Sequence, residues 1–218
     1  MAIVTNPSVL VSITSDLVCP WCWVGLRKLQ AASELAKVDV DIIWKPFLLR
    51  PNTPQEGSPK GGTATSRVPQ RLKEAGKSVG IAFTGLTDRT PNTIDFHATM
   101  KYLLDSKINQ TPFQEAVFDG YFTKGVFPDH QGMMESAKQV EVLDHVKTFL
   151  GSQDVLQEYR KLVEAEASDA SRRGVHGVPS FAFNGGKEAF SGAQNVETFV
   201  KCLKQHASST STTTTVSD

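Results

Sequence analysis

The stretch that decides the fold is SVLVSITSDLVCPWCWVGLRKL, residues 8–29. Its first part, residues 8–14, is rich in β-branched residues, which predicts a strand. Residues 20–37 then place apolar side chains at helical spacing, and Pro20 suits the first position of that helix. Residues 38–49 predict a second strand. A strand, helix and strand of these lengths form a crossover unit with two parallel strands.

The rest of the chain predicts an interrupted α/β fold. Residues 50–66 hold three prolines and three glycines and predict a long loop. Strand character returns at residues 178–183, before an Asn-Gly-Gly turn, a partner strand at 189–191 and a closing helix at 195–206. Between these halves we predict helices at residues 68–76, 93–105, 112–124, 131–141, 144–150 and 153–172. The order β-α-β, helical block, β-β-α resembles a thioredoxin fold with a large all-helical insertion.

The predicted domains follow this order. Residues 8–62 and 173–206 are expected to form the thioredoxin-like domain, and residues 63–172 the inserted helical domain. Residues 207–218 are predicted to be a disordered tail, because nine of the last eleven residues are serine or threonine.

Composition excludes several classes of protein. The chain has 218 residues, of which 39% are hydrophobic, so it can bury a core. Its 23 basic and 23 acidic residues balance, whereas nucleic-acid-binding proteins usually carry a basic excess. No apolar run approaches the roughly 20 residues of a membrane span. We therefore expect neither a nucleic-acid nor a membrane partner, and the oligomeric state stays open.

The cysteine content bears on the compartment and the chemistry. Cys19, Cys22 and Cys202 are the only cysteines, too few for a disulfide scaffold. The N-terminus lacks the pattern of a secretory signal, so we expect a cytoplasmic protein. In a reducing compartment a close cysteine pair is catalytic or metal-binding rather than structural. Cys202, in the closing helix, is expected to be a half-buried small residue.

Cys19 and Cys22 lie three residues apart on the first helical turn, which places both thiols on one face. The helix N-terminus favours negative charge, so Cys19 should be the exposed nucleophile with the lower pKa. Cys22, one turn deeper, should be buried and should attack a mixed disulfide from within. Pro20 and Trp21 between them are expected to shape the substrate-binding surface.

A zinc half-site is the alternative interpretation of this pair. A closed structural zinc site needs four ligands, and no second pair at finger-like spacing accompanies Cys19 and Cys22. We therefore predict no metal. An inert buried pair is a further alternative.

The second half of the predicted site is Val178-Pro179, just before the third strand. We expect this peptide bond to be cis and the Val178 backbone to be free to pair with an extended substrate. An ordinary trans proline at a strand boundary is the alternative. His176 could contact the substrate. Asp16 is expected to be a loop residue or to act on the thiol proton.

Four motifs resemble the DsbA-like thioredoxin superfamily, in its FrnE-type branch. They are the active-site segment at residues 12–29, the proline loop HGVPSF at 176–181, the segment SGAQ at 191–194, and Asn92-Thr93 followed by His97. The basic residue common after that histidine is Ala98 here. The resemblance implies a thiol–disulfide oxidoreductase or isomerase with an inserted helical domain.

The resemblance implies a disulfide or thiol substrate, which could be a protein, and no cofactor beyond a Cys19–Cys22 disulfide. Whether glutathione serves as a cosubstrate stays open. Kappa-class glutathione transferases and hydroxychromene-carboxylate isomerases share the architecture but use serine at the position of Cys19, so they form the second hypothesis. A chaperone or binding module with incidental thiols is the third.

Overall fold

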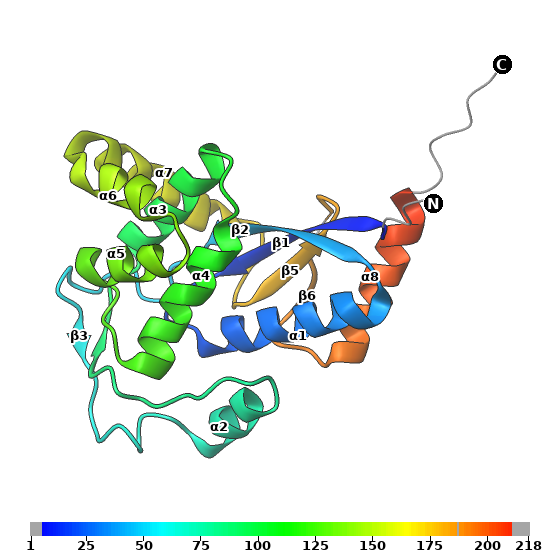
Figure 1. Cartoon of the computed structure of the whole chain (residues 1–218), viewed down its shortest axis with the longest axis horizontal. Coiled ribbons are helices and arrows are strands. Elements are labelled where there is room, and N and C mark those ends of the chain that lie inside the picture. The colour runs from blue at the N-terminus through cyan, green and yellow to red at the C-terminus, as the bar shows by residue number, and fades with distance from the viewer. Residues whose placement is uncertain (1–5, 187, 211–218) are drawn as a thin grey trace.

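The structure of the chain, a computed structural model, describes residues 6–186 and 188–210 and is mixed α/β (Figure 1). The elements of the two α/β parts are β1 (Ser8–Ser15), α1 (Pro20–Ala36), β2 (Asp39–Pro46), β5 (Ser180–Phe183), β6 (Glu188–Ser191) and α8 (Val196–Thr210). Those between are β3 (Ser58–Pro59), α2 (Gln70–Lys77), β4 (Arg89–Thr90), α3 (Ile94–Asp105), α4 (Gln110–Asp119), the π-helical turn η1 (Gly120–Lys124), α5 (His130–Gln139), α6 (Leu143–Gly151) and α7 (Gln153–Arg172).

The main sheet has the strand order β2-β1-β5-β6. β1 pairs with β2 in parallel, while β5 pairs antiparallel with both β1 and β6. Alternate residues of β1 are fully buried, because one face of the strand packs into the core; they are Val9, Val11 and Ile13. This topology confirms the predicted interrupted thioredoxin fold.

The helices divide between the two parts of the molecule. α1 packs against α8, whereas α3, α4 and α7 pack against β2. Figure 1 shows α3–α7 gathered at one end of the sheet, with α2 beside the N-terminal end of α1. The helical insertion and the loop before α2 therefore surround the end of the sheet at which α1 begins.

Most elements lie where the sequence predicts them, with three differences. The loop at residues 50–66 contains β3, which pairs with β4. The aromatic-rich helix predicted at 112–124 is α4 followed by η1. α8 extends to Thr210, so it includes residues 207–210 of the predicted tail, and residues 211–218 lie outside the described part. The domain boundaries themselves remain predictions.

Within residues 6–186 and 188–210, no helix is both long and apolar enough to cross a membrane.

Candidate active site

The two cysteines lie where β1 gives way to α1. Cys19 is the N-cap residue of α1, with extended backbone, and Pro20 follows at the start of the helix. The Cys19 amide donates to the Asp16 carbonyl at 3.0 Å, which fixes the turn between β1 and α1. Cys22, on the first turn of α1, is completely buried, as predicted. Cys19 is only 7% exposed, so the predicted exposure of this thiol is wrong.

The Val178-Pro179 loop lies against the buried Cys19. The Cys19 thiol donates to the Val178 carbonyl at 3.4 Å, which brings together residues 159 positions apart in the chain. The peptide bond between Val178 and Pro179 is cis, as expected from the sequence. The loop therefore covers the Cys19 sulfur with main-chain atoms.

The two thiols differ in acidity. A hydrogen bond from the Cys22 side chain lowers the pKa of Cys19, and this outweighs the opposing effect of burial. Backbone amides of the first helical turn add to the lowering. Burial raises the pKa of Cys22 well above its ordinary value. These pKa shifts favour a thiolate on Cys19 over one on Cys22, and the roles expected for the two residues stay predictions.

Gly25 allows the proline loop to approach α1 closely. A methyl group at this position would lie 3.0 Å from the Phe181 ring and 3.2 Å from Pro179 Cγ. Both neighbours are buried, so neither can move freely. Sequence reasoning missed this role, because a glycine within a helical pattern shows no packing partner.

Asp16 is a fully buried carboxylate beside the cysteine pair. Its Oδ2 accepts a hydrogen bond from the Leu49 amide at 2.7 Å, which is the loop role predicted for it. Its Oδ1 lies 3.4 Å from His97 Nε2 on α3. The motif Asn92-Thr93 followed by His97 therefore reaches the cysteine pair through His97. No local sequence pattern reveals its partner Asp16, which lies 81 residues away.

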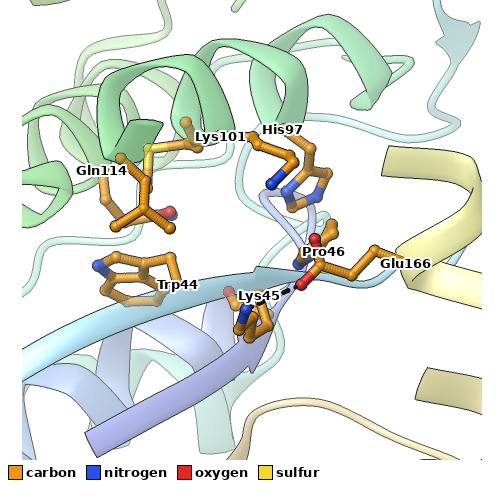
Figure 2. A pocket seen from close by; sticks show the side chains of 10 residues that line it. Trp44, Lys45, Pro46, His97, Lys101, Gln114 and Glu166 are labelled. Atoms are coloured by element: carbon orange, nitrogen blue, oxygen red, sulfur yellow. Dashed lines mark ion pairs between the residues drawn. The ribbon is translucent and has the colours of Figure 1, made fainter. Parts of the chain in front are cut away.

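A small polar cavity lies beyond this pair (Figure 2). Figure 2 shows His97 and Lys101 reaching toward it from α3, and Lys45 paired with Glu166 at 3.0 Å. Ser15 also lines this cavity. The Ser15 hydroxyl lowers the pKa of Cys22, although it forms no hydrogen bond of good geometry. The ion pair with Glu166 thus holds Lys45 on the side of the cavity opposite His97.

The remaining predicted site residues differ in their surroundings. Trp21 is half-buried, and the Arg71 guanidinium lies 5.5 Å from the centre of its ring. His176 is exposed, and its predicted contact with substrate stays a prediction. Cys202 is half-buried in α8, where burial raises its pKa.

In the described part of the chain, no group of three or more His, Cys, Asp or Glu side chains is arranged to hold a metal ion.

A family model described as the DsbA-like thioredoxin domain matches residues 10–204. The chain belongs to the DsbA-like thioredoxin family. A search of curated proteins gives no match to it.

Solved structures agree with this DsbA-like fold. A probable DsbA oxidoreductase from Streptomyces coelicolor has a TM-score of 0.73 at 24% identity, covering 96% of this chain and 94% of that one. A 2-hydroxychromene-2-carboxylate isomerase has a TM-score of 0.65 at 14% identity, covering 94% and 100%. The cytosolic disulfide reductase DsbM from Pseudomonas aeruginosa, solved with glutathione, has a TM-score of 0.57 at 14% identity, covering 93% and 98%.

Proposed function

We propose that this DsbA-like chain is a dithiol–disulfide oxidoreductase in which Cys19 is the nucleophile and Cys22 the resolving thiol. The observation that carries the proposal is the unequal acidity of two thiols on one helical turn. The pKa of Cys19 is lowered and that of Cys22 raised. One thiol can therefore attack while the other stays protonated until it is needed.

In the reducing direction, the Cys19 thiolate attacks one sulfur of the substrate disulfide and expels the other as a thiolate. Cys22 loses its proton and attacks the Cys19 sulfur, which releases the second substrate thiolate. The substrate gains two electrons, and the Cys19–Cys22 pair becomes a disulfide. The reverse sequence oxidises a dithiol. The relative reduction potentials of protein and substrate decide the direction.

The Val178 main chain lies against the reacting sulfur and supports a binding role. Its carbonyl accepts from the Cys19 thiol in the reduced protein. An extended substrate chain could pair with this backbone while its cysteine bonds to Cys19, as in β-strand addition. Pro20 and Trp21 would form the adjoining surface. A substrate of this kind could be a protein or a smaller disulfide.

The proposed chemistry requires no cofactor besides the cysteine pair. A thiol such as glutathione would regenerate the dithiol or serve as cosubstrate, and the DsbM structure solved with glutathione supports this choice. We further propose a cytoplasmic location, where a glutathione pool is available. The low cysteine content supports that location.

Reduction of insulin, followed by the turbidity of its free B chain with glutathione as the reductant, tests the assignment. Cys19→Ser should abolish turnover, because the nucleophile is lost. Cys22→Ser should still attack but accumulate a mixed disulfide visible by non-reducing electrophoresis and mass spectrometry. Cys202→Ser, on α8, is the matched cysteine control and should behave as the wild type.

Each alternative function gives a different result. Full turnover by Cys22→Ser would favour a monothiol glutathione-dependent transferase or isomerase. Retained client holding by the Cys19→Ser, Cys22→Ser double variant, without wild-type turnover, would favour a binding module. Faster alkylation of Cys22 than of Cys19 at neutral pH would reverse the two roles.

A further inference from the structure

A cavity of about 300 Å³ lies beside the nucleophile. Val18 and Pro20, the residues on either side of Cys19, form part of its wall. The other walls come from the segment before α2 and α2 itself, the segment before β4 and β4 itself, and η1. The other lining residues are Arg50, Lys60, Arg67, Val68, Leu72, Phe83, Gly85, Thr87, Thr90, Tyr121 and Phe122.

The charges on this wall have one sign. Arg50, Lys60 and Arg67 line the cavity, and none of its lining residues is an aspartate or glutamate. We call it the cationic cavity. Its charge contrasts with the whole chain, in which 23 basic and 23 acidic residues balance. The local excess therefore reflects where the fold places these side chains.

Backbone carbonyls hold the Arg67 guanidinium in place. It donates to the carbonyls of Gly61, Gly62 and Gly85 at 3.3, 2.9 and 3.2 Å. These bonds use three of the five N–H donors, and all three acceptors are neutral carbonyls rather than carboxylates. The guanidinium is therefore fixed in position, and two of its N–H donors are not used in these bonds.

Lys60 is held in a similar way. Its Nζ lies 3.4 Å from the Thr87 hydroxyl and 4.5 Å from the centre of the Tyr121 ring. Its pKa is lowered to about 8, first by burial and then by the nearby Arg67 charge, whereas the exposed Asp88 has a smaller, opposite effect. Burial and the Arg67 guanidinium make it costly to keep this ammonium charged, and a bound anion would offset that cost.

A second, more open cavity of about 630 Å³ continues from the first, with which it shares Arg50, Lys60 and Thr90. It too has no acidic lining residue. The two together can take a charged group near Cys19 and a longer remainder of the same molecule.

We propose that the cationic cavity binds a carboxylate of the disulfide substrate while Cys19 attacks the substrate sulfur. This assignment deepens the proposed oxidoreductase function and rests on it. Arg67 and Lys60 would donate charge-assisted hydrogen bonds to the carboxylate. Arg50, exposed at the junction of the two cavities, would attract it as it enters.

Three small disulfides of similar size test the proposal. They are 3,3′-dithiodipropionate, which is anionic, bis(2-hydroxyethyl) disulfide, which is neutral, and cystamine, which is cationic. The wild type should give a kcat/KM for the anion about tenfold above that for the neutral compound, as one charge-assisted hydrogen bond allows. Cystamine should be the poorest substrate.

Lys60→Met should lower the ratio of anion to neutral kcat/KM, and Lys60→Arg should largely restore it. Lys147→Met, an exposed lysine on α6, is the matched control and should keep the wild-type ratio. Arg50→Met provides a second variant that should lower the ratio even where Lys60→Met folds poorly. Glutathione disulfide and an acidic peptide disulfide then distinguish the two sources of the carboxylate. The compound whose kcat/KM is lower for Lys60→Met than for the wild type identifies the source.

Equal kcat/KM for the three compounds in the wild type, or an unchanged ratio in both Lys60→Met and Arg50→Met, would overturn the carboxylate site. Failure of all three compounds to react would instead count against the oxidoreductase function itself. The two proposals therefore fail in distinguishable ways.

Discussion

The carboxylate of Asp16 sets the charge around the thiol pair. It is 0% exposed and raises the pKa of Cys19, an effect outweighed by the hydrogen bond from Cys22. His97 and the Leu49 amide hold the carboxylate in position. A negative charge so close to a thiolate makes the reduced form less stable than it would otherwise be.

Replacing this charge should change the acidity of Cys19. Asp16→Asn keeps an oxygen for the Leu49 amide but removes the negative charge, so the pKa of Cys19 should fall further. The reduced form should then be more stable and the pair more oxidising. The rate of alkylation by iodoacetamide as a function of pH measures the pKa, with exposed Asp144→Asn as the control. An unchanged profile would show that Asp16 acts only as a loop anchor.

Gly25 offers a purely steric prediction at the same scale. Gly25→Val should push on Phe181 and Pro179 and cost about 1–3 kcal/mol, the usual effect of overpacking a core. It should also slow disulfide exchange, because the Val178 carbonyl that faces Cys19 belongs to the displaced loop. Gly151→Val is the matched control, since nothing lies within 4 Å of a methyl group built there. Equal thermal midpoints for the two variants would contradict this account.

At the scale of elements, one carboxylate on α3 connects the inserted helices. Asp95 is 3% exposed and accepts from Arg160 on α7 at 2.6 and 2.8 Å. It also lies 2.7 Å from His130 Nε2 on α5 and accepts from Gln55 at 3.0 Å. Burial raises the pKa of Asp95, but these partners, Arg160 first, lower it below its ordinary value. The cluster also fixes the loop that leads to the cationic cavity.

Asp95→Asn should therefore destabilise the protein by about 3 kcal/mol. This value is at the low end of the cost of breaking a buried ion pair, because Arg160 is partly exposed. Asp105→Asn, whose ion pair with Lys101 lies on the exposed side of α3, should cost at most about 1 kcal/mol. Because the folded-state pKa of Asp95 is lowered, its contribution is present above pH 3.8 and is lost as the pH falls through the folded value. Urea unfolding of both variants at pH 7 and in acid measures these differences, and equal losses for the two would refute the assignment.

The turn η1 shows why the sequence predicts an element better than its details. The sequence predicts one helix at residues 112–124, and α4 with η1 occupies that range. The change to π-helical geometry leaves no mark in a 3.6-residue pattern. Yet it is η1 that carries Tyr121 and Phe122 to the wall of the cationic cavity. Sequence reasoning thus finds the helix but not the π-helical turn that brings these two rings to the cavity wall.

At the scale of the molecule, the sequence predicts what local patterns determine. The cysteine pair, its place between β1 and α1, and the proline loop all follow from short motifs and chain order. The pairing of His97 with Asp16 and the approach of Lys60 to Arg67 do not, because each depends on how the inserted segment folds back. The predicted exposure of Cys19 is wrong for a different reason: the carbonyl of Val178, 159 residues away and outside the insertion, lies against its sulfur.

The charge of Lys60 in the cationic cavity should make the substrate preference of the whole molecule depend on pH. Lys60 has a pKa lowered to about 8, and Arg67, Asp88, Tyr121 and Thr87 are the groups that surround it. Its charge should be largely present at pH 7 and lost as the pH rises through about 8. The preference for dithiodipropionate over bis(2-hydroxyethyl) disulfide should therefore fall between about pH 7 and 9, since the carboxylates, with a pKa near 4, stay ionised throughout.

Taking the ratio of the two substrates removes the ionisation of Cys19, which affects both rates equally. Some preference for the anion should persist at pH 9, because the two arginines of the cavity keep their charge. Lys60→Met should give a lower ratio that is flat across this range. A wild-type ratio that is equally flat would show that Lys60 does not contact the anion, whereas a wild-type ratio that rises with pH would place the carboxylate away from the cationic cavity altogether.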